Sequence, residues 1–254
     1  MLDKPNKIDS FRIVDGPSLQ SLSPGAALDS FPDAAPPSLS ASKEEVIAFA
    51  STIPGWMEPE ELSWLYDTAT TMDSVLEIGS FAGRSTLVLC HACPGQVISV
   101  DSYFPPEKEL QHMMAKKDIK AMFDFHLQNF LGTKLTQHRI ESLWASKIPD
   151  IPAKIDMIFV DGGHDFVSVW RDLCNWAHRA AKIICGHDYD VRGYPDVKRA
   201  VDEYFCPKLG GNLLGVRPGD HPDVKRGVDR FFSQRNITPK IGAHTIWYVD
   251  WRTI

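Results

Sequence analysis

The chain has 254 residues, 43% hydrophobic and 24% charged, which is enough to bury one sizeable core. Its 27 lysines and arginines stand against 33 acidic residues, a net charge of −6 with no basic stripe to neutralise phosphates, so we expect no nucleic-acid partner. The N-terminus lacks the apolar core of a secretory signal and no apolar run is long enough to span a membrane, so we expect a soluble, cytoplasmic protein.

The first part of the chain differs in composition from the rest. Residues 1–41 are rich in Pro, Ser, Ala and Gly and poor in large apolar side chains, which predicts a mobile leader. One domain should follow over residues 42–254. Its first helix should begin after Ser42, because Ser42 and Glu45 have capping-box spacing. A second helix should begin near Pro59, which suits a first helical turn.

From residue 74 onwards, short apolar runs alternate with longer amphipathic stretches. The predicted strands are Ser74–Gly79, Gln96–Asp101, Ile155–Asp161 and Lys182–His187, with helices near 84–93, 107–130 and 166–179. A last run, 245–250, has no helix after it and is expected to close the sheet as an antiparallel strand. The pattern predicts an α/β fold with a Rossmann-like, doubly wound, mostly parallel sheet and helices on both faces.

The first predicted strand runs into a glycine-containing turn that precedes a helix. Gly79 and Gly83 allow a tight turn and a close approach between backbone and ligand, and the free N–H groups of the new helix favour a carboxylate. A dinucleotide fingerprint would need glycine where this chain has Phe81. We therefore expect no pyrophosphate in this turn.

Two acidic residues accompany the turn. Asp101 ends the second strand 22 residues after Gly79, close to the offset of about 20 at which a carboxylate meets ribose hydroxyls in nucleotide-binding units. Alone it would be an ordinary loop residue, but beside the glycine turn it is predicted to bind ribose. Glu77 lies inside an apolar strand, so it should be hydrogen-bonded, either serving the turn or binding an ammonium group of the ligand.

Three stretches at predicted strand ends carry a family resemblance: 76–86, 155–164 and 186–189. In this order they resemble class I S-adenosylmethionine-dependent methyltransferases of the type 24 family, which are related to the catechol-type and macrolide-sugar O-methyltransferases. The resemblance extends over about residues 44 to 250. It implies S-adenosylmethionine as the cofactor, in contact with Glu77, Gly79, Ser85 and Asp101, with Ser142 near the adenine and Asp161 near the methionine end. The predicted cofactor site also includes the neighbouring residues Ser80, Gly83, Ser102 and Gly162.

Asp161, His187 and Asp188 form a candidate metal site. They follow two strands that are neighbours in this fold, so their side chains should converge. Oxygen donors with one imidazole can bind Mg²⁺ or a similar cation and leave positions open for substrate oxygens. The catechol-type relatives hold their metal at these three places with acidic or amide residues. His187 replaces an oxygen ligand, which leaves Mn²⁺, Fe²⁺ or no metal as alternatives.

His164 is a candidate general base. It falls three residues after Asp161, where catechol-type enzymes carry the lysine that removes the substrate proton, and histidine can do this work at neutral pH. The other interpretation is a role in packing or at the helix start. The sugar-methylating relatives use an acid where this chain has Gly163, which leaves Asp165 and Asp190 as substitutes. The predicted catalytic residues are therefore His164, Asp161 and His187.

A segment of the C-terminal part is duplicated. Residues 194–205 recur as 221–232 with eight of twelve positions identical. The family resemblance implies a single helix here. The second copy is either a tolerated surface duplication or a lid or oligomer contact, because it follows from the loop that carries His187 and Asp188.

The features together predict an enzyme that methylates an oxygen of a small-molecule acceptor, with or without a divalent metal. Two alternatives stay open: a catalytically silent binding or assembly protein on the same fold, and a hydroxylase-like relative that needs a second cofactor. A homo-oligomer is compatible with each of these functions.

Overall fold

The computed structural model of the chain describes residues 35–104, 118–189, 194–205, 237 and 239–253. The helices are α1 (Lys43–Ala50), α2 (Pro59–Ala69), α3 (Arg84–Ala92), α5 (Ile119–Leu127), α6 (Ser142–Ala145), α7 (Phe166–Trp176) and α8 (Pro195–Phe205), with the 3-10 helices η1 (Ala177–Arg179) and η2 (Trp251–Thr253). The strands are β1 (Ser74–Ile78), β2 (Gln96–Val100), β3 (Leu135–His138), β4 (Ile155–Val160), β5 (Ala180–Gly186), β6 (Lys240–Ile241) and β7 (Trp247–Asp250). In this part of the chain no helix has the length and apolarity needed to cross a membrane.

The strands form one sheet in the order β3-β2-β1-β4-β5-β7-β6. Strands β1 to β5 pair in parallel, and β7 runs antiparallel between β5 and β6. The predicted α/β fold and its antiparallel closing strand are confirmed. After β1 the chain adds β2 and β3 on one side of that strand, and it then returns to add β4 on the other side. The strand order therefore reverses between β1 and β4. Ligands bind at the carboxyl ends of strands beside such a reversal.

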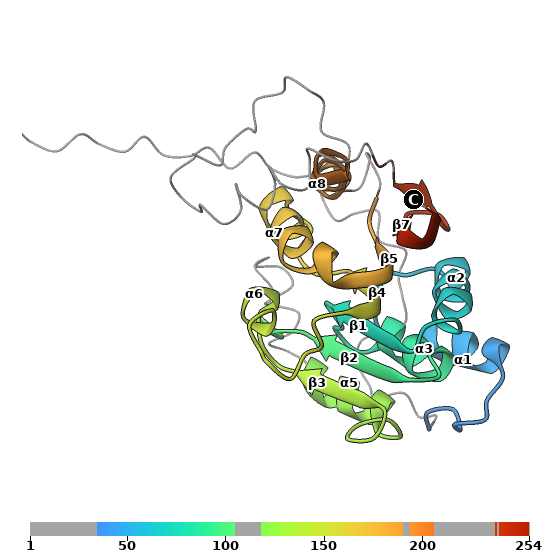
Figure 1. Ribbon diagram of the computed structural model, residues 1–254. Coiled ribbons are helices and arrows are strands. Elements are labelled where there is room, and N and C mark those ends of the chain that lie inside the picture. Colours follow the sequence, from blue (N-terminus) through green and yellow to red (C-terminus); the bar gives the residue numbers. More distant parts are fainter. Residues whose placement is uncertain (1–34, 105–117, 190–193, 206–236, 238, 254) are drawn as a thin grey trace, which may run out of the picture.

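Two hydrophobic clusters cover the two faces of the sheet. Residues of α1, α2, α3 and α5 pack against one face, which includes Val75 and Phe159. Residues of α6, α7 and α8 pack against the other, which includes Leu76 and Ile158. Figure 1 shows α7 and α8 on one side of the strands and α1, α2 and α3 on the other. Successive strand residues point to opposite faces, so a strand buried on both faces is apolar throughout, as β1 and β4 nearly are.

Helices α1 and α2 begin at the residues whose types predict a helix N-terminus. The Ser42 hydroxyl accepts from the backbone N–H of Glu45, and the Glu45 carboxylate accepts from the N–H of Ser42, which completes a capping box before α1. Pro59 is the first residue of α2, as expected. These signals act over three or four residues, so they can be found without knowledge of the tertiary structure.

Some elements differ from the sequence prediction. The short elements β3, α6 and β6 were not predicted. Only one residue of β3, Leu135, is buried, so this edge strand has no apolar run to reveal it. Within the predicted helix 107–130 the structure has α5, while residues 107–117 lie outside the described residues. Residues 35–41 of the expected leader contain no helix or strand. The rest of the leader, and the second copy of the duplicated segment, are outside the described part, whereas the first copy forms α8.

Candidate active site

Gly79 and Gly83 shape the turn after β1, and packing explains both. Gly79 has φ 87°, and a Cβ there would lie 2.0 Å from the carbonyl oxygen of Asp161. Gly83 is the N-cap of α3 with φ 94°, and its Cβ would lie 2.5 Å from the Leu127 side chain. A side chain at either position would be strained and would collide with its neighbours. The glycines therefore let β1 and β4 approach closely at their carboxyl ends and bring α5 against the turn.

Glu77 lies inside β1 and is fully buried. Its carboxylate accepts hydrogen bonds from the hydroxyls of Ser85 and Thr86 in the first turn of α3. Burial raises the pKa of Glu77 to about 7, even though these hydroxyls act in the opposite direction. Glu77 thus anchors the helix that follows the glycine turn, and a contact with the ammonium group of a ligand stays a prediction.

Asp101 follows β2 and faces the same turn. Its Oδ2 accepts the N–H groups of Ser80 and Phe81, each at 2.8 Å, and its Oδ1 accepts the N–H of Tyr103 at 2.6 Å. The Ser80 hydroxyl contacts the hydroxyl of Ser99 at 2.6 Å. Asp101 therefore links the ends of β1 and β2, which is where a ribose binds in nucleotide-binding units of this topology. The predicted site residue Ser102 bonds within its own loop, to the N–H of Phe104 at 3.1 Å.

Ser142, predicted near the adenine, begins α6. Its hydroxyl accepts from the indole Nε1 of Trp176 at 2.7 Å and hydrogen-bonds the carboxyl group of Asp172. Burial raises the pKa of Asp172 to about 6. Asp172 lies close to the predicted cofactor residue Gly162, since a Cβ on that glycine would be 3.4 Å from its Oδ2. The structure therefore connects Ser142 to the loop after β4 through α7.

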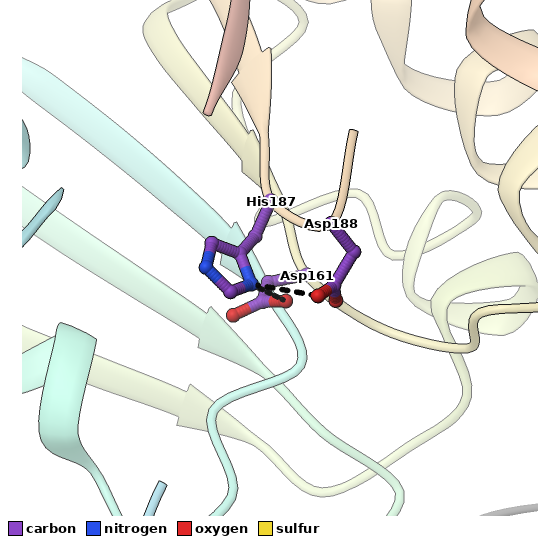
Figure 2. A group of neighbouring side chains, drawn as sticks. All are labelled: Asp161, His187 and Asp188. Atoms are coloured by element: carbon purple, nitrogen blue, oxygen red, sulfur yellow. Dashed lines mark ion pairs between the residues drawn. The ribbon is translucent and has the colours of Figure 1, made fainter. Parts of the chain in front are cut away.

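Asp161, His187 and Asp188 converge at the carboxyl ends of β4 and β5 (Figure 2). His187 Nδ1 lies 3.2 Å from Asp188 Oδ1 and 3.7 Å from Asp161 Oδ1. One ligand atom from each residue can be chosen so that all three lie within 4.8 Å of one another. Two carboxylates and an imidazole at this spacing are a suitable donor set for a divalent cation.

The sequence prediction missed Glu61, the partner of His187 on its other side. His187 Nε2 lies 2.9 Å from Glu61 Oε2, and both side chains are almost fully buried, with 6% and 3% exposed. Glu61 belongs to the first turn of α2, far from His187 in the sequence. Its one signal in the sequence is its place three residues after Glu58, with which it forms a capping box.

Electrostatics at this cluster follow from burial and close charges. Burial alone would raise the pKa of Glu61, but the hydrogen bond and charge of His187, with N–H groups from Glu58 and Thr245, lower it to about 2. Burial would lower the pKa of His187, but the charge of Asp161 and hydrogen bonds with Asp188 and Glu61 raise it well above the usual value. Nδ1 of His187 is the ring nitrogen beside the two acidic side chains, and a cation bound there would compete with a proton for it.

His164 joins the cluster through Asp188. Its Nε2 lies 3.0 Å from Asp188 Oδ2, and 31% of its side chain is exposed. The ring of Tyr194 lies against the imidazole, with the centroids 4.7 Å apart. His164, Gly163 and the three cluster residues line one small hollow together with apolar side chains, including Trp247. This histidine can therefore meet a group that enters from solvent.

Asp165 and Asp190 were the substitutes for His164 as the base. Asp165 is the N-cap of α7, where its Oδ1 accepts the N–H groups of Val167 and Ser168 at 3.0 and 3.1 Å. That capping role uses its carboxylate, so Asp165 is a poor substitute. Asp190 is outside the described residues.

The strand order is that of a Rossmann-like α/β fold, and the acid–histidine cluster lies at the carboxyl ends of its strands. Residues 76–189 match the model of a family described as a methyltransferase domain, the type 24 methyltransferases. This match to a methyltransferase domain agrees with the family resemblance that the sequence shows.

Solved structures of similar fold have low sequence identity. The SAH-bound Podospora anserina methyltransferase PaMTH1 is 14% identical with a TM-score of 0.51, over 82% of this chain and 87% of that chain. The O-methyltransferase NovP is 13% identical with a TM-score of 0.50, over 76% and 79%. These two likenesses show a shared fold. No curated protein matches the chain in sequence.

Proposed function

We propose that this protein transfers the methyl group of S-adenosylmethionine to an oxygen atom of a small-molecule acceptor. The observation that carries the proposal is the convergence of His164 with Asp161, His187 and Asp188 in one hollow at the strand ends of a methyltransferase domain. A candidate base that is partly exposed beside such a cluster is the arrangement that removal of a proton from an acceptor hydroxyl requires.

The methyl donor would bind along the carboxyl ends of β1, β2 and β4. The turn from Gly79 to Gly83 and the first turn of α3 present backbone N–H groups that suit its carboxylate. Asp101 would accept hydrogen bonds from its ribose, and Ser142 would lie near its adenine, as the family resemblance implies. Each of these residues is already held by contacts inside the protein, so the proposed site would need little rearrangement to bind the donor.

A divalent cation fits the residues that are present. Asp161 and Asp188 offer carboxylate oxygens and His187 offers Nδ1, and a cation held there would make the proton on an acceptor oxygen easier to remove. His164 would take that proton through its imidazole, while Asp188 keeps the ring oriented through its contact with Nε2. S-adenosylmethionine, when bound, would supply the methyl group from its sulfonium to the acceptor oxygen and would leave as S-adenosylhomocysteine.

Labelled S-adenosylmethionine, incubated with the protein and a panel of phenols, sugars and carboxylates with and without Mn²⁺ or Mg²⁺, tests the proposal. We expect label in at least one hydroxylated acceptor, and we expect S-adenosylmethionine and S-adenosylhomocysteine to raise the melting temperature where NAD does not. Stabilisation without transfer to any acceptor would favour a binding or assembly protein. No stabilisation by either methionine derivative would contradict the proposed donor.

A further inference from the structure

Glu61 has every acceptor position of its carboxylate occupied. Oε1 accepts the backbone N–H and the hydroxyl of Thr245, at 3.0 and 2.8 Å. Oε2 accepts the backbone N–H of Glu58 at 2.9 Å and meets His187 Nε2 at 2.9 Å. A carboxylate has about four lone-pair sites, so these four contacts use all of them.

These contacts determine which ring nitrogen of His187 carries a proton. The two backbone partners of Glu61 can only donate, so its oxygens must be acceptors on both sides. Nε2 of His187 must then carry hydrogen, because two acceptors at 2.9 Å would repel each other. The remaining nitrogen, Nδ1, is the one that faces Asp161 and Asp188 (Figure 2).

We propose that Glu61 is a positioning residue for the metal centre: it keeps the Nε2 proton on His187 and so presents Nδ1 as a nitrogen ligand that favours Mn²⁺ or a similar transition-metal ion over Mg²⁺. The inference rests on the cation site of the proposed function. Histidine ligands commonly donate their second N–H to a carboxylate, and the loss of such a partner usually weakens metal binding about 10- to 100-fold. An imidazole among the donors suits transition metals, whereas Mg²⁺ prefers oxygen ligands only.

Glu61→Gln tests the role of this carboxylate, because an amide cannot accept at both of its positions. With its NH₂ group at the Oε1 position, the amide would face the backbone N–H of Thr245. With its NH₂ group at the Oε2 position, the amide would donate to His187 Nε2, and the ring proton would move to Nδ1. Glu60→Gln is the matched control, since Glu60 is the preceding residue and its side chain is 69% exposed. Thr245→Val is the second control, because it removes one hydrogen bond to Glu61 Oε1 and leaves Oε2 and His187 unchanged.

The measurements are Mn²⁺ binding from the electron paramagnetic resonance signal of free Mn²⁺, competition by Mg²⁺, and ring-nitrogen NMR of the metal-free protein, with His187→Asn for assignment. We expect Glu61→Gln to weaken Mn²⁺ binding about 10- to 100-fold, to reduce the preference for Mn²⁺ over Mg²⁺, and to remove the stable Nε2–H signal. Both controls should retain the parent values.

Unchanged Mn²⁺ affinity and an unchanged Nε2–H signal in Glu61→Gln would overturn the inference. A parent protein that binds no Mn²⁺, or an equal loss in Thr245→Val, would also overturn it, the latter by assigning the effect to packing. S-adenosylmethionine binding by calorimetry separates this result from the proposed function. A protein that binds the methyl donor but not Mn²⁺ refutes only the metal role, and one that binds Mn²⁺ but not the donor refutes the proposed function.

Discussion

Glu77→Gln should make the stability of the protein less dependent on pH. Burial raises the pKa of Glu77 from its ordinary value of 4.5 to about 7 in the folded state. Below pH 4.5 the carboxyl group is protonated in both states. Between pH 4.5 and about 7 the folded state keeps the proton that the unfolded chain releases. The contribution of Glu77 to the free energy of unfolding therefore falls as the pH rises and is lowest above pH 7. The variant has no such group to ionise.

The magnitude follows from the two pKa values. Each pKa unit corresponds to about 1.4 kcal/mol, so the difference between 4.5 and about 7 corresponds to about 3 kcal/mol of unfolding free energy lost between acidic and alkaline pH. An amide keeps the hydrogen bonds with Ser85 and Thr86, because a hydroxyl can donate to its oxygen or accept from its nitrogen. Packing around residue 77 should therefore be preserved.

Urea unfolding without cofactor, at several values between pH 4.5 and 8.5, measures this effect. Other groups titrate over the same range, so the quantity of interest is the free energy of the parent minus that of Glu77→Gln at each pH. This difference should become more negative by about 3 kcal/mol, with most of the change below pH 7. Parallel curves for the two proteins would refute the reasoning and show that Glu77 ionises normally inside the strand.

Two further predictions concern the chemistry and the donor. His164→Ala should reduce the methyl-transfer rate about 10²- to 10⁴-fold with nearly unchanged affinity for S-adenosylmethionine, measured by single-turnover assay and calorimetry. Full activity in this variant would remove His164 from the role of base. Asp101→Ala should weaken binding of S-adenosylmethionine by about 1–3 kcal/mol in calorimetry, the scale for a lost charged hydrogen bond. If the variant and the parent bind S-adenosylmethionine with equal affinity, the role of Asp101 is confined to its contacts within the turn.

The order of the elements could be predicted because its signals are local. Ser42 and Pro59 mark helix starts within one turn, and the apolar runs of β1 and β4 are typical of strands buried on both faces. The edge strand at Leu135 gave no such signal, since only one of its four residues is buried. Edge elements are therefore the part of this fold that depends most on tertiary contacts.

The convergence of Asp161, His187 and Asp188 could be predicted for a topological reason. Parallel strands that are neighbours end at the same edge of the sheet, so residues just after β4 and β5 must lie together. The hydrogen bond of Asp172 with Ser142 and its place near Gly162 had no such basis. They depend on the rotation of α7 about its own axis, which the packing of α7 against the sheet determines.

Glu61 shows why this limit matters for function. The rule of strand ends identifies side chains that can face a ligand, but a ligand atom is also oriented by its partner on the far side. For His187 that partner comes from α2 and is itself fixed by Thr245, just before β7. Three segments that are distant in the sequence meet at one carboxylate. Because that carboxylate contacts the segment before β7 as well as the histidine, comparing Glu61→Gln with Thr245→Val separates its two effects, since Thr245→Val removes a contact with Thr245 and spares the imidazole.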